Sequence, residues 1–226
     1  MTVAFAMRGS DGPPVIFLHG VGGDWRSFEP QLDHFSRNFI AIAWNMPGYG
    51  GSRPLAGMTF PALADALAEL LDDLNFSRAH LVGHSIGGMV VQEFLARHPG
   101  RVRSAVLSAT SPAFGRADGD FQKQFLAARL GPLDGGASMA DLAPDIVDSL
   151  VGADPDPLCK GIALRCMSEV PEAAYRQAMT CITTFDRRDN ADRTVKVRDW
   201  CEDLYDDDWE QDCDRFASTE LWTERK

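Results

Sequence analysis

The residues best suited to chemistry are Gly83-His84-Ser85-Ile86-Gly87, which lie between a short apolar run at 79–82 and a longer one beginning at Met89. This order predicts a strand, a sharp turn and a helix, with a serine at the apex of the turn. A strained turn of this kind projects the serine hydroxyl above the sheet, and glycines two residues on either side let the backbone pass closely. The segment therefore indicates nucleophilic attack by Ser85 on a carbonyl carbon. A serine hydroxyl is a poor nucleophile without a base, and histidine is the side chain that most often serves as that base.

Five histidines are available as the base: His19, His34, His80, His84 and His98. His98 lies at the far end of the helix that follows Ser85, about 20 Å away at ~1.5 Å per residue. His80 begins the preceding strand, about 15 Å away at ~3.3 Å per residue. His34 is expected on the surface, and the side chain of His84 is expected to diverge from the hydroxyl and to pack. His19 remains a surrogate base of low rank, because it ends a strand expected beside the strand of the serine.

Short apolar runs interrupted by helical patterns predict a parallel α/β sheet. We expect strands at 3–7, 15–18, 39–44, 79–82 and 103–108. A helix is expected from Phe60 to Leu74, with Thr59 as its N-cap and Pro61 in its first turn. Another continues from Met89 to Leu95. Functional loops should follow the carboxyl ends of the strands.

The strand signal fades from Pro112 to about Phe185. Helical segments at 120–130 and 139–150 are separated by Gly/Pro/Asp clusters, including Gly131-Pro132. A helical lid over the mouth of the sheet explains this pattern, and so does a set of surface helices; we favour the lid.

Composition narrows the classes of partner. The formal net charge of −11 argues against binding to nucleic acid or to an anionic membrane, because both are negative. No apolar run has the length of a membrane span, and no signal peptide is visible at the N-terminus. Five cysteines without C-x-x-C spacing favour reduced thiols in a cytoplasmic protein. We expect no metal and no cofactor.

Three segments together resemble the α/β-hydrolase superfamily: Leu18-His-Gly-Val-Gly-Gly23, Asn45-Met-Pro-Gly-Tyr-Gly-Gly-Ser52, and 83–88. The stretch from Arg103 to Asp189 is similar to the cap region of 3-oxoadipate enol-lactonase-like members. The resemblance covers roughly residues 3 to 191. One departure is Asn45, where the family more often has Asp.

The resemblance implies a catalytic role for Ser85 as nucleophile and an oxyanion hole made by the backbone N–H groups of Val21 and Ile86. Physical chemistry supports the same arrangement, because N–H groups at a helix start and in a glycine-rich loop can face a developing negative charge. In the family the acid and the histidine follow two later strands, and nothing in residues 192–226 matches them. The fold expected is therefore an α/β-hydrolase fold with a mostly parallel sheet and a helical cap, C-terminally incomplete.

Three regions are expected: a core at 1–111, a helical cap at 112–191, and an acidic, atypical tail at 192–226. The tail has 12 acidic and 6 basic side chains and three of the five tryptophans. The pattern allows a single amphipathic helix in it. We interpret the tail as a solvated acidic terminus in preference to a partner site, and its origin as a truncated or frame-shifted gene end.

Two functions follow from these observations. The first is a serine hydrolase of small carboxylic esters or lactones, weak or inactive because no catalytic histidine follows Ser85. The second is a hydrolase-derived binding module without turnover. Loss of the histidine from a Ser-His-Asp unit lowers kcat by about 10⁶, whereas an oxyanion hole alone leaves roughly 10³–10⁴ over water.

Overall fold

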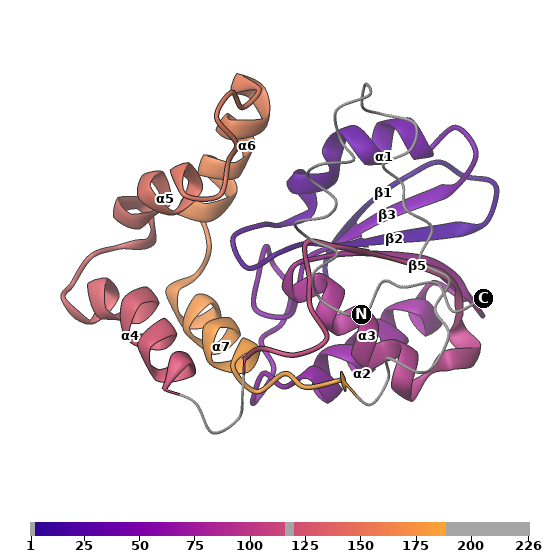
Figure 1. The fold of residues 1–226 in the computed structure, drawn as a ribbon. Helices are drawn as coiled ribbons and strands as arrows, with labels where there is room; N and C mark the ends of the chain where they lie inside the picture. Colours follow the sequence, from indigo (N-terminus) through magenta and orange to yellow (C-terminus); the bar gives the residue numbers. More distant parts are fainter. Residues whose placement is uncertain (1–2, 116–119, 189–226) are drawn as a thin grey trace, which may run out of the picture.

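A computed structural model describes residues 3–115 and 120–188, which build one five-stranded sheet flanked by helices (Figure 1). The strands are β1 (Phe5–Arg8), β2 (Pro14–Leu18), β3 (Ile40–Trp44), β4 (Ala79–His84) and β5 (Val102–Ser108). Their order across the sheet is β1-β3-β2-β4-β5. The pairs β2–β3, β2–β4 and β4–β5 are parallel, whereas β1 is antiparallel to β3. The mostly parallel sheet predicted from the alternating runs is confirmed.

Helices cover both faces of the sheet. The helices before residue 112 are α1 (Glu29–Phe35), α2 (Phe60–Asp73) and α3 (Ile86–Arg97), with short 3-10 helices η1 (Trp25–Phe28) and η2 (Pro99–Arg101). Figure 1 places α1 on one side of the sheet and α2 with α3 on the other. All five residues of β2 are buried, because the strand lies mid-sheet between these two layers. The apolar run at 15–18 is therefore the sign of a strand covered on both faces.

The start of α2 is as predicted. The Thr59 hydroxyl accepts a hydrogen bond from the Ala62 N–H at 3.3 Å, and Pro61 occupies the first turn. Proline is tolerated there because its missing N–H would have no partner inside the helix. Leu63, Leu67 and Leu70 form the buried stripe that packs toward the sheet.

Four further helices lie to one side of the sheet: α4 (Phe121–Asp134), α5 (Met139–Asp148), α6 (Pro157–Ser168) and α7 (Glu172–Ile182) (Figure 1). The chain leaves and re-enters the core at one place, which we call the neck, where 112–114 pairs with 185–187. There the Phe114 N–H donates to the Phe185 carbonyl at 2.9 Å, and the Arg187 N–H donates to the Pro112 carbonyl at 2.7 Å. Buried residues of α5, α6 and α7 belong to the same hydrophobic cluster as α2, α3 and the sheet. The two ends of the helical segment are thus joined by backbone hydrogen bonds at the neck, and its helices pack on the core.

One expected boundary is wrong. We expected Gly131-Pro132 to separate helices, but α4 continues through both residues to Asp134. Pro132 stands in the last turn, where its missing N–H removes a single bond, and the buried Leu133 anchors that turn. The acidic segment 192–226 lies outside the described residues, as does any amphipathic helix in it. Across 3–115 and 120–188, none of the helices combines the length and apolar character needed to cross a bilayer.

Candidate functional site

Ser85 occupies the sharp turn between β4 and α3. Its backbone has φ 54° and ψ −121°, a region that residues other than glycine rarely adopt. The Ser85 N–H donates to the Ser108 carbonyl at 2.9 Å, and the Ser85 carbonyl accepts from the Gly88 N–H at 2.9 Å. The strain is therefore held by β5 on one side and by the first turn of α3 on the other. The strand–turn–helix geometry predicted from the spacing is present.

The glycines around Ser85 are required by close packing. A methyl group added to Gly87 would lie 2.2 Å from the Leu18 carbonyl oxygen, so the start of α3 presses on the end of β2. A methyl group on Gly83 would lie 2.5 Å from the Gly87 carbonyl oxygen. Real Cβ atoms do not approach so closely, and only glycine lets strand and helix meet at this angle.

The loop after β2, residues 19–23, lies beside Ser85. A methyl group on Gly20 would be 3.3 Å from the Ser85 Cβ, which sets the loop against the serine. The loop closes as a turn, with the Gly23 N–H donating to the Gly20 carbonyl at 3.0 Å. Among the described residues, no acceptor is hydrogen-bonded to the backbone N–H of Val21 or of Ile86. The two N–H donors expected for an oxyanion hole thus belong to adjoining segments, and within the described residues neither is used in a hydrogen bond.

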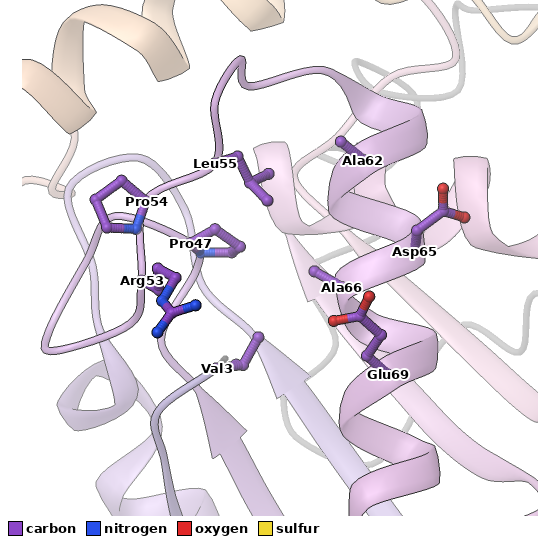
Figure 2. Close-up of a pocket in the computed structure, with 9 residues that line it drawn as sticks. All are labelled: Val3, Pro47, Arg53, Pro54, Leu55, Ala62, Asp65, Ala66 and Glu69. Atoms are coloured by element: carbon purple, nitrogen blue, oxygen red, sulfur yellow. The ribbon is translucent and has the colours of Figure 1, made fainter. Parts of the chain in front are cut away.

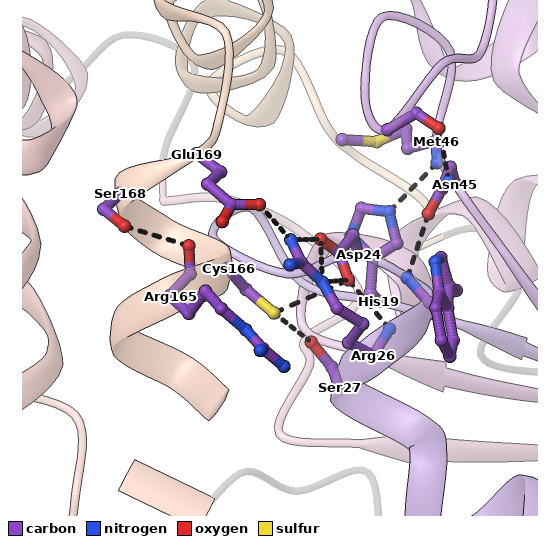
Figure 3. Close-up of polar contacts among 12 residues, drawn as sticks. His19, Asp24, Arg26, Ser27, Asn45, Met46, Arg165, Cys166, Ser168 and Glu169 are labelled. Atoms are coloured by element: carbon purple, nitrogen blue, oxygen red, sulfur yellow. Dashed lines mark hydrogen bonds and ion pairs between the residues drawn. The ribbon is translucent and has the colours of Figure 1, made fainter. Parts of the chain in front are cut away.

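Both ring nitrogens of His19 are engaged. Nδ1 lies 2.7 Å from the Gly20 carbonyl oxygen, and the Met46 N–H donates to Nε2 at 2.9 Å (Figure 3). Because Nε2 is the acceptor, Nδ1 carries the proton. Burial lowers the pKa of His19 to about 4, and the ring is 1% exposed. His19 is a neutral, buried ring that links the loop at 19–23 to the loop after β3.

None of the other four histidines, all of which the structure describes, is hydrogen-bonded to the Ser85 hydroxyl. His80 Nδ1 is 2.7 Å from the Ser104 hydroxyl, and His98 Nε2 is 3.3 Å from an Asp65 carboxylate oxygen. His34 is exposed on α1. The ring edge of His84 packs against Gly20, as expected, and its burial lowers the pKa of the ring, although the residue as a whole is exposed at the end of β4.

In the described part of the chain, no side chain is hydrogen-bonded to the Ser85 hydroxyl. Nor do three His, Cys, Asp or Glu side chains gather there closely enough to bind a metal ion.

Asn45, the departure from the family pattern, uses both ends of its amide. Its Oδ1 accepts from the Trp25 N–H at 2.9 Å, and its Nδ2 donates to the Gly50 carbonyl at 2.7 Å. An aspartate at this position could supply the acceptor but not the donor. The asparagine therefore fits the hydrogen bonding of the turn at 46–50, where Gly48 and Gly50 have positive φ.

A polar cluster that the sequence did not reveal joins α6 to the segment after the glycine loop (Figure 3). Asp24, 7% exposed, receives hydrogen bonds from the Arg26 N–H and guanidinium and from the Cys166 thiol. Arg26 also pairs with Glu169 at 2.6 Å. Asp24 and Cys166 are 142 positions apart, so no local pattern could have brought them together.

The described cavities lie away from the serine. The larger, about 330 Å³, lies between the loop at 47–55 and α2, with Arg53 on one wall and Asp65 and Glu69 on the other (Figure 2). The smaller, about 160 Å³, is lined in part by Glu93 and Arg187. Neither cavity includes Ser85 in its wall.

Comparison with known proteins identifies the class. Residues 13–131 match the family described as alpha/beta hydrolase fold, and the chain belongs to this family. Over 106 residues the chain is 37% identical to a dihydrolipoyllysine-residue acetyltransferase component of an acetoin cleaving system from Cupriavidus necator, covering 46% of this chain and 28% of that protein. Over 105 residues it is 38% identical to a pimeloyl-[acyl-carrier protein] methyl ester esterase from Chromobacterium violaceum, covering 46% and 40%. The matched stretches thus span less than half the length of these relatives.

Solved structures agree on the fold. The enol-lactonase from Burkholderia xenovorans LB400 superposes with a TM-score of 0.72 at 22% identity, over 86% of this chain and 75% of that one. At this identity the likeness shows the fold alone. The resemblance to the superfamily drawn from the three sequence motifs is confirmed.

Proposed function

We propose that this chain is a serine hydrolase of small carboxylic esters or lactones by descent, with Ser85 as its nucleophile. The observation that carries the proposal is the backbone of Ser85 at φ 54° and ψ −121°, held between β5 and α3. Such strain persists only where the surrounding structure imposes it, and it presents the hydroxyl at the carboxyl end of the sheet. The similarity to the esterase named above supports this substrate class.

The oxyanion hole is proposed to be the backbone N–H groups of Val21 and Ile86. Ile86 begins α3, where the first N–H groups of the helix have no partner within it. Val21 belongs to the loop that Gly20 sets against Ser85. Two such donors can stabilise negative charge on a carbonyl oxygen attacked by the serine, worth about 10²–10³ in kcat for each donor.

We further propose that turnover is weak or absent in these 226 residues. A base must come within about 3 Å of the Ser85 hydroxyl, and none of the five histidines is hydrogen-bonded to it in the described part of the chain. His19, proposed as a surrogate base from the sequence, has both nitrogens engaged and is neutral. Its proposed role is to hold the loop at 19–23, which we call the oxyanion loop. The helices α4–α7 are proposed to be the cap of the hydrolase core.

A second function, a binding module without turnover, is favoured by the lack of a base at the Ser85 hydroxyl in the part of the chain that the structure describes. The Ser85 hydroxyl has no hydrogen-bonding side chain among the described residues, whereas the two oxyanion donors remain free. A chain of this kind would bind a carbonyl compound without cleaving it.

The test is hydrolysis of p-nitrophenyl butyrate by the purified chain, by its Ser85→Ala variant and by Ser149→Ala, an exposed serine at the end of α5. We expect all three rates to lie near the uncatalysed background. Robust hydrolysis abolished by Ser85→Ala but not by Ser149→Ala would establish the nucleophile and refute the absence of a base. His19→Gln would then decide whether that base is His19.

A further inference from the structure

We propose that helix α6 holds the oxyanion loop in place, with Asp24 as the positioning residue that transmits this support to Val21. This inference rests on the proposed function of Val21. In this proposal α6 does more than cover the sheet: its side chains contact one side of the loop, and residues of the core contact the other side.

Asp24 receives most of the contacts. It caps η1, with Oδ1 accepting from the Arg26 N–H at 2.7 Å, and both carboxylate oxygens accept from Arg26 Nε at 3.0 Å. Burial raises the pKa of Asp24, but the hydrogen bonds from Arg26 outweigh it and keep that pKa below its usual range. The carboxylate therefore stays charged at neutral pH. A buried, charged and multiply bonded side chain holds its backbone in one conformation.

Helix α6 completes the cluster with two side chains from its C-terminal end. The Cys166 thiol, 2% exposed, donates to Asp24 Oδ1 at 3.5 Å, and the Ser27 hydroxyl lies 4.0 Å from its sulfur. Burial and the charge of Asp24 raise the pKa of Cys166 to about 11, so the thiol keeps the proton that it donates. Glu169 accepts from Arg26 at 2.6 Å and draws the guanidinium toward α6.

Met167 makes the contact closest to the proposed donor. A methyl group on Gly22 would lie 2.0 Å from Met167 Cε and 2.7 Å from its Sδ, so the thioether covers the residue next to Val21. Met167 is 5% exposed and belongs to the main hydrophobic cluster. Gly22 of the loop, Asp24 at the start of η1 and Arg26 within η1 thus meet Met167 and Cys166 of α6 and its C-cap Glu169, respectively.

The core holds the opposite side. Asn45 Oδ1 accepts from the Trp25 N–H, and His19 accepts from the Met46 N–H. Figure 3 shows these bonds and the α6 contacts on different sides of the segment 19–27. The loop therefore has contacts with the core on one side and with the cap on the other. Substitutions at Cys166 or Glu169 remove cap contacts and leave the hydrogen bonds of Asn45 and Met46 in place.

The first measurement is amide hydrogen exchange over residues 19–28 in the full chain. Cys166→Ala removes the thiol donor, and Glu169→Gln weakens the pull on Arg26. Each should speed exchange in 20–27 about tenfold, which is the effect of losing one charge-assisted hydrogen bond. Cys166→Ser keeps a donor and should restore slow exchange. Cys181→Ala, a buried thiol of α7, and Arg176→Gln, an ion-paired arginine of α7, are the matched controls and should leave the loop unchanged.

The second measurement follows the Val21 and Ile86 amide protons by NMR during titration with phenylboronic acid. Its trigonal boron becomes a tetrahedral anion when it forms a bond to the Ser85 hydroxyl oxygen, with the hydroxyl proton released to the buffer, and this anion would face the proposed oxyanion hole. In the parent chain both amides should shift. In Cys166→Ala the Val21 shift should fall by half or more while the Ile86 shift persists, because Ile86 is held by α3 and not by α6. A merely structural role for α6 would reduce both shifts together.

The outcomes separate the two proposals. No boronate shift at either amide of the parent chain overturns the proposed function. If both amides shift and the shifts persist in Cys166→Ala and Glu169→Gln, the role of α6 is overturned and the proposed function stands. The role of α6 is also overturned if amide hydrogen exchange in the loop is unchanged in these variants, or if it speeds equally in the control variants.

Discussion

Replacement of His19 by glutamine should remove a defined part of the acid sensitivity of the fold. Burial lowers the pKa of His19 from 6.5 to about 4, so the folded chain keeps the ring neutral at a pH where the unfolded chain protonates it. Between these two values the unfolded state binds the extra proton. The free energy of unfolding contributed by His19 is therefore complete above pH 6.5 and is lost as the pH falls toward 4.

The size of the effect follows from the same two values. At about 1.4 kcal/mol for each pKa unit, the depression corresponds to about 3 kcal/mol of unfolding free energy between neutral pH and pH 4. The ring is 1% exposed, so solvent screening does not reduce this value much. Glutamine keeps a side-chain acceptor for the Met46 N–H but cannot ionise, so the variant should lack this part of the pH dependence.

The assay is urea unfolding of the parent chain and of His19→Gln at several pH values from 7 to 4, followed by circular dichroism. The parent should lose about 3 kcal/mol more than the variant over this range. Burial also lowers the pKa of His80, but both chains share that contribution and it cancels in the difference. His34→Gln, at an exposed position of α1, should behave as the parent does. A parent–variant difference that stays constant with pH would refute the neutral, doubly bonded ring.

Two further predictions concern the backbone around the site. Asn45→Asp should destabilise the fold by about 1–3 kcal/mol, because the Gly50 carbonyl loses its donor and faces a carboxylate; thermal unfolding checks this, and Asn38→Asp, on an exposed loop, should have little effect. Gly87→Ala should lower the melting temperature strongly or prevent folding, because the added methyl lies 2.2 Å from the Leu18 carbonyl oxygen. Gly100→Ala meets nothing within 4 Å and serves as its control. Equal melting temperatures for the two alanine variants would contradict the close contact of α3 with β2.

Local patterns predict most of the sheet and the turn of Ser85. The buried runs of β2 and β3, the N-cap of α2 and the strained serine all depend on residues close in sequence, so spacing was sufficient to predict them. The Asp24–Cys166 contact depends on chain segments more than a hundred residues apart, and no single-sequence pattern encodes such a distance. The hydrogen bonds of the His19 ring could not be predicted for the same reason, because one partner, the Met46 N–H, belongs to the loop after β3.

The continuation of α4 shows a different limit. Gly131 and Pro132 are strong breakers by propensity, yet burial of Leu133 kept the helix intact to Asp134. Proline costs about 3 kcal/mol in a helix interior, but tertiary packing routinely overrides propensity, and here Pro132 stands in the last turn beside a buried leucine.

The neck at 112–114 and 185–187 makes the helices α4–α7 an exchangeable module. Because its two ends lie side by side, the segment can be replaced by another of different length without moving β5, α3 or the serine between them. Such grafting is not free of constraint: a substitute must supply its own side chains to meet Gly22, Asp24 and Arg26. Recombination at the neck can therefore introduce only those helical segments whose side chains are compatible with this loop.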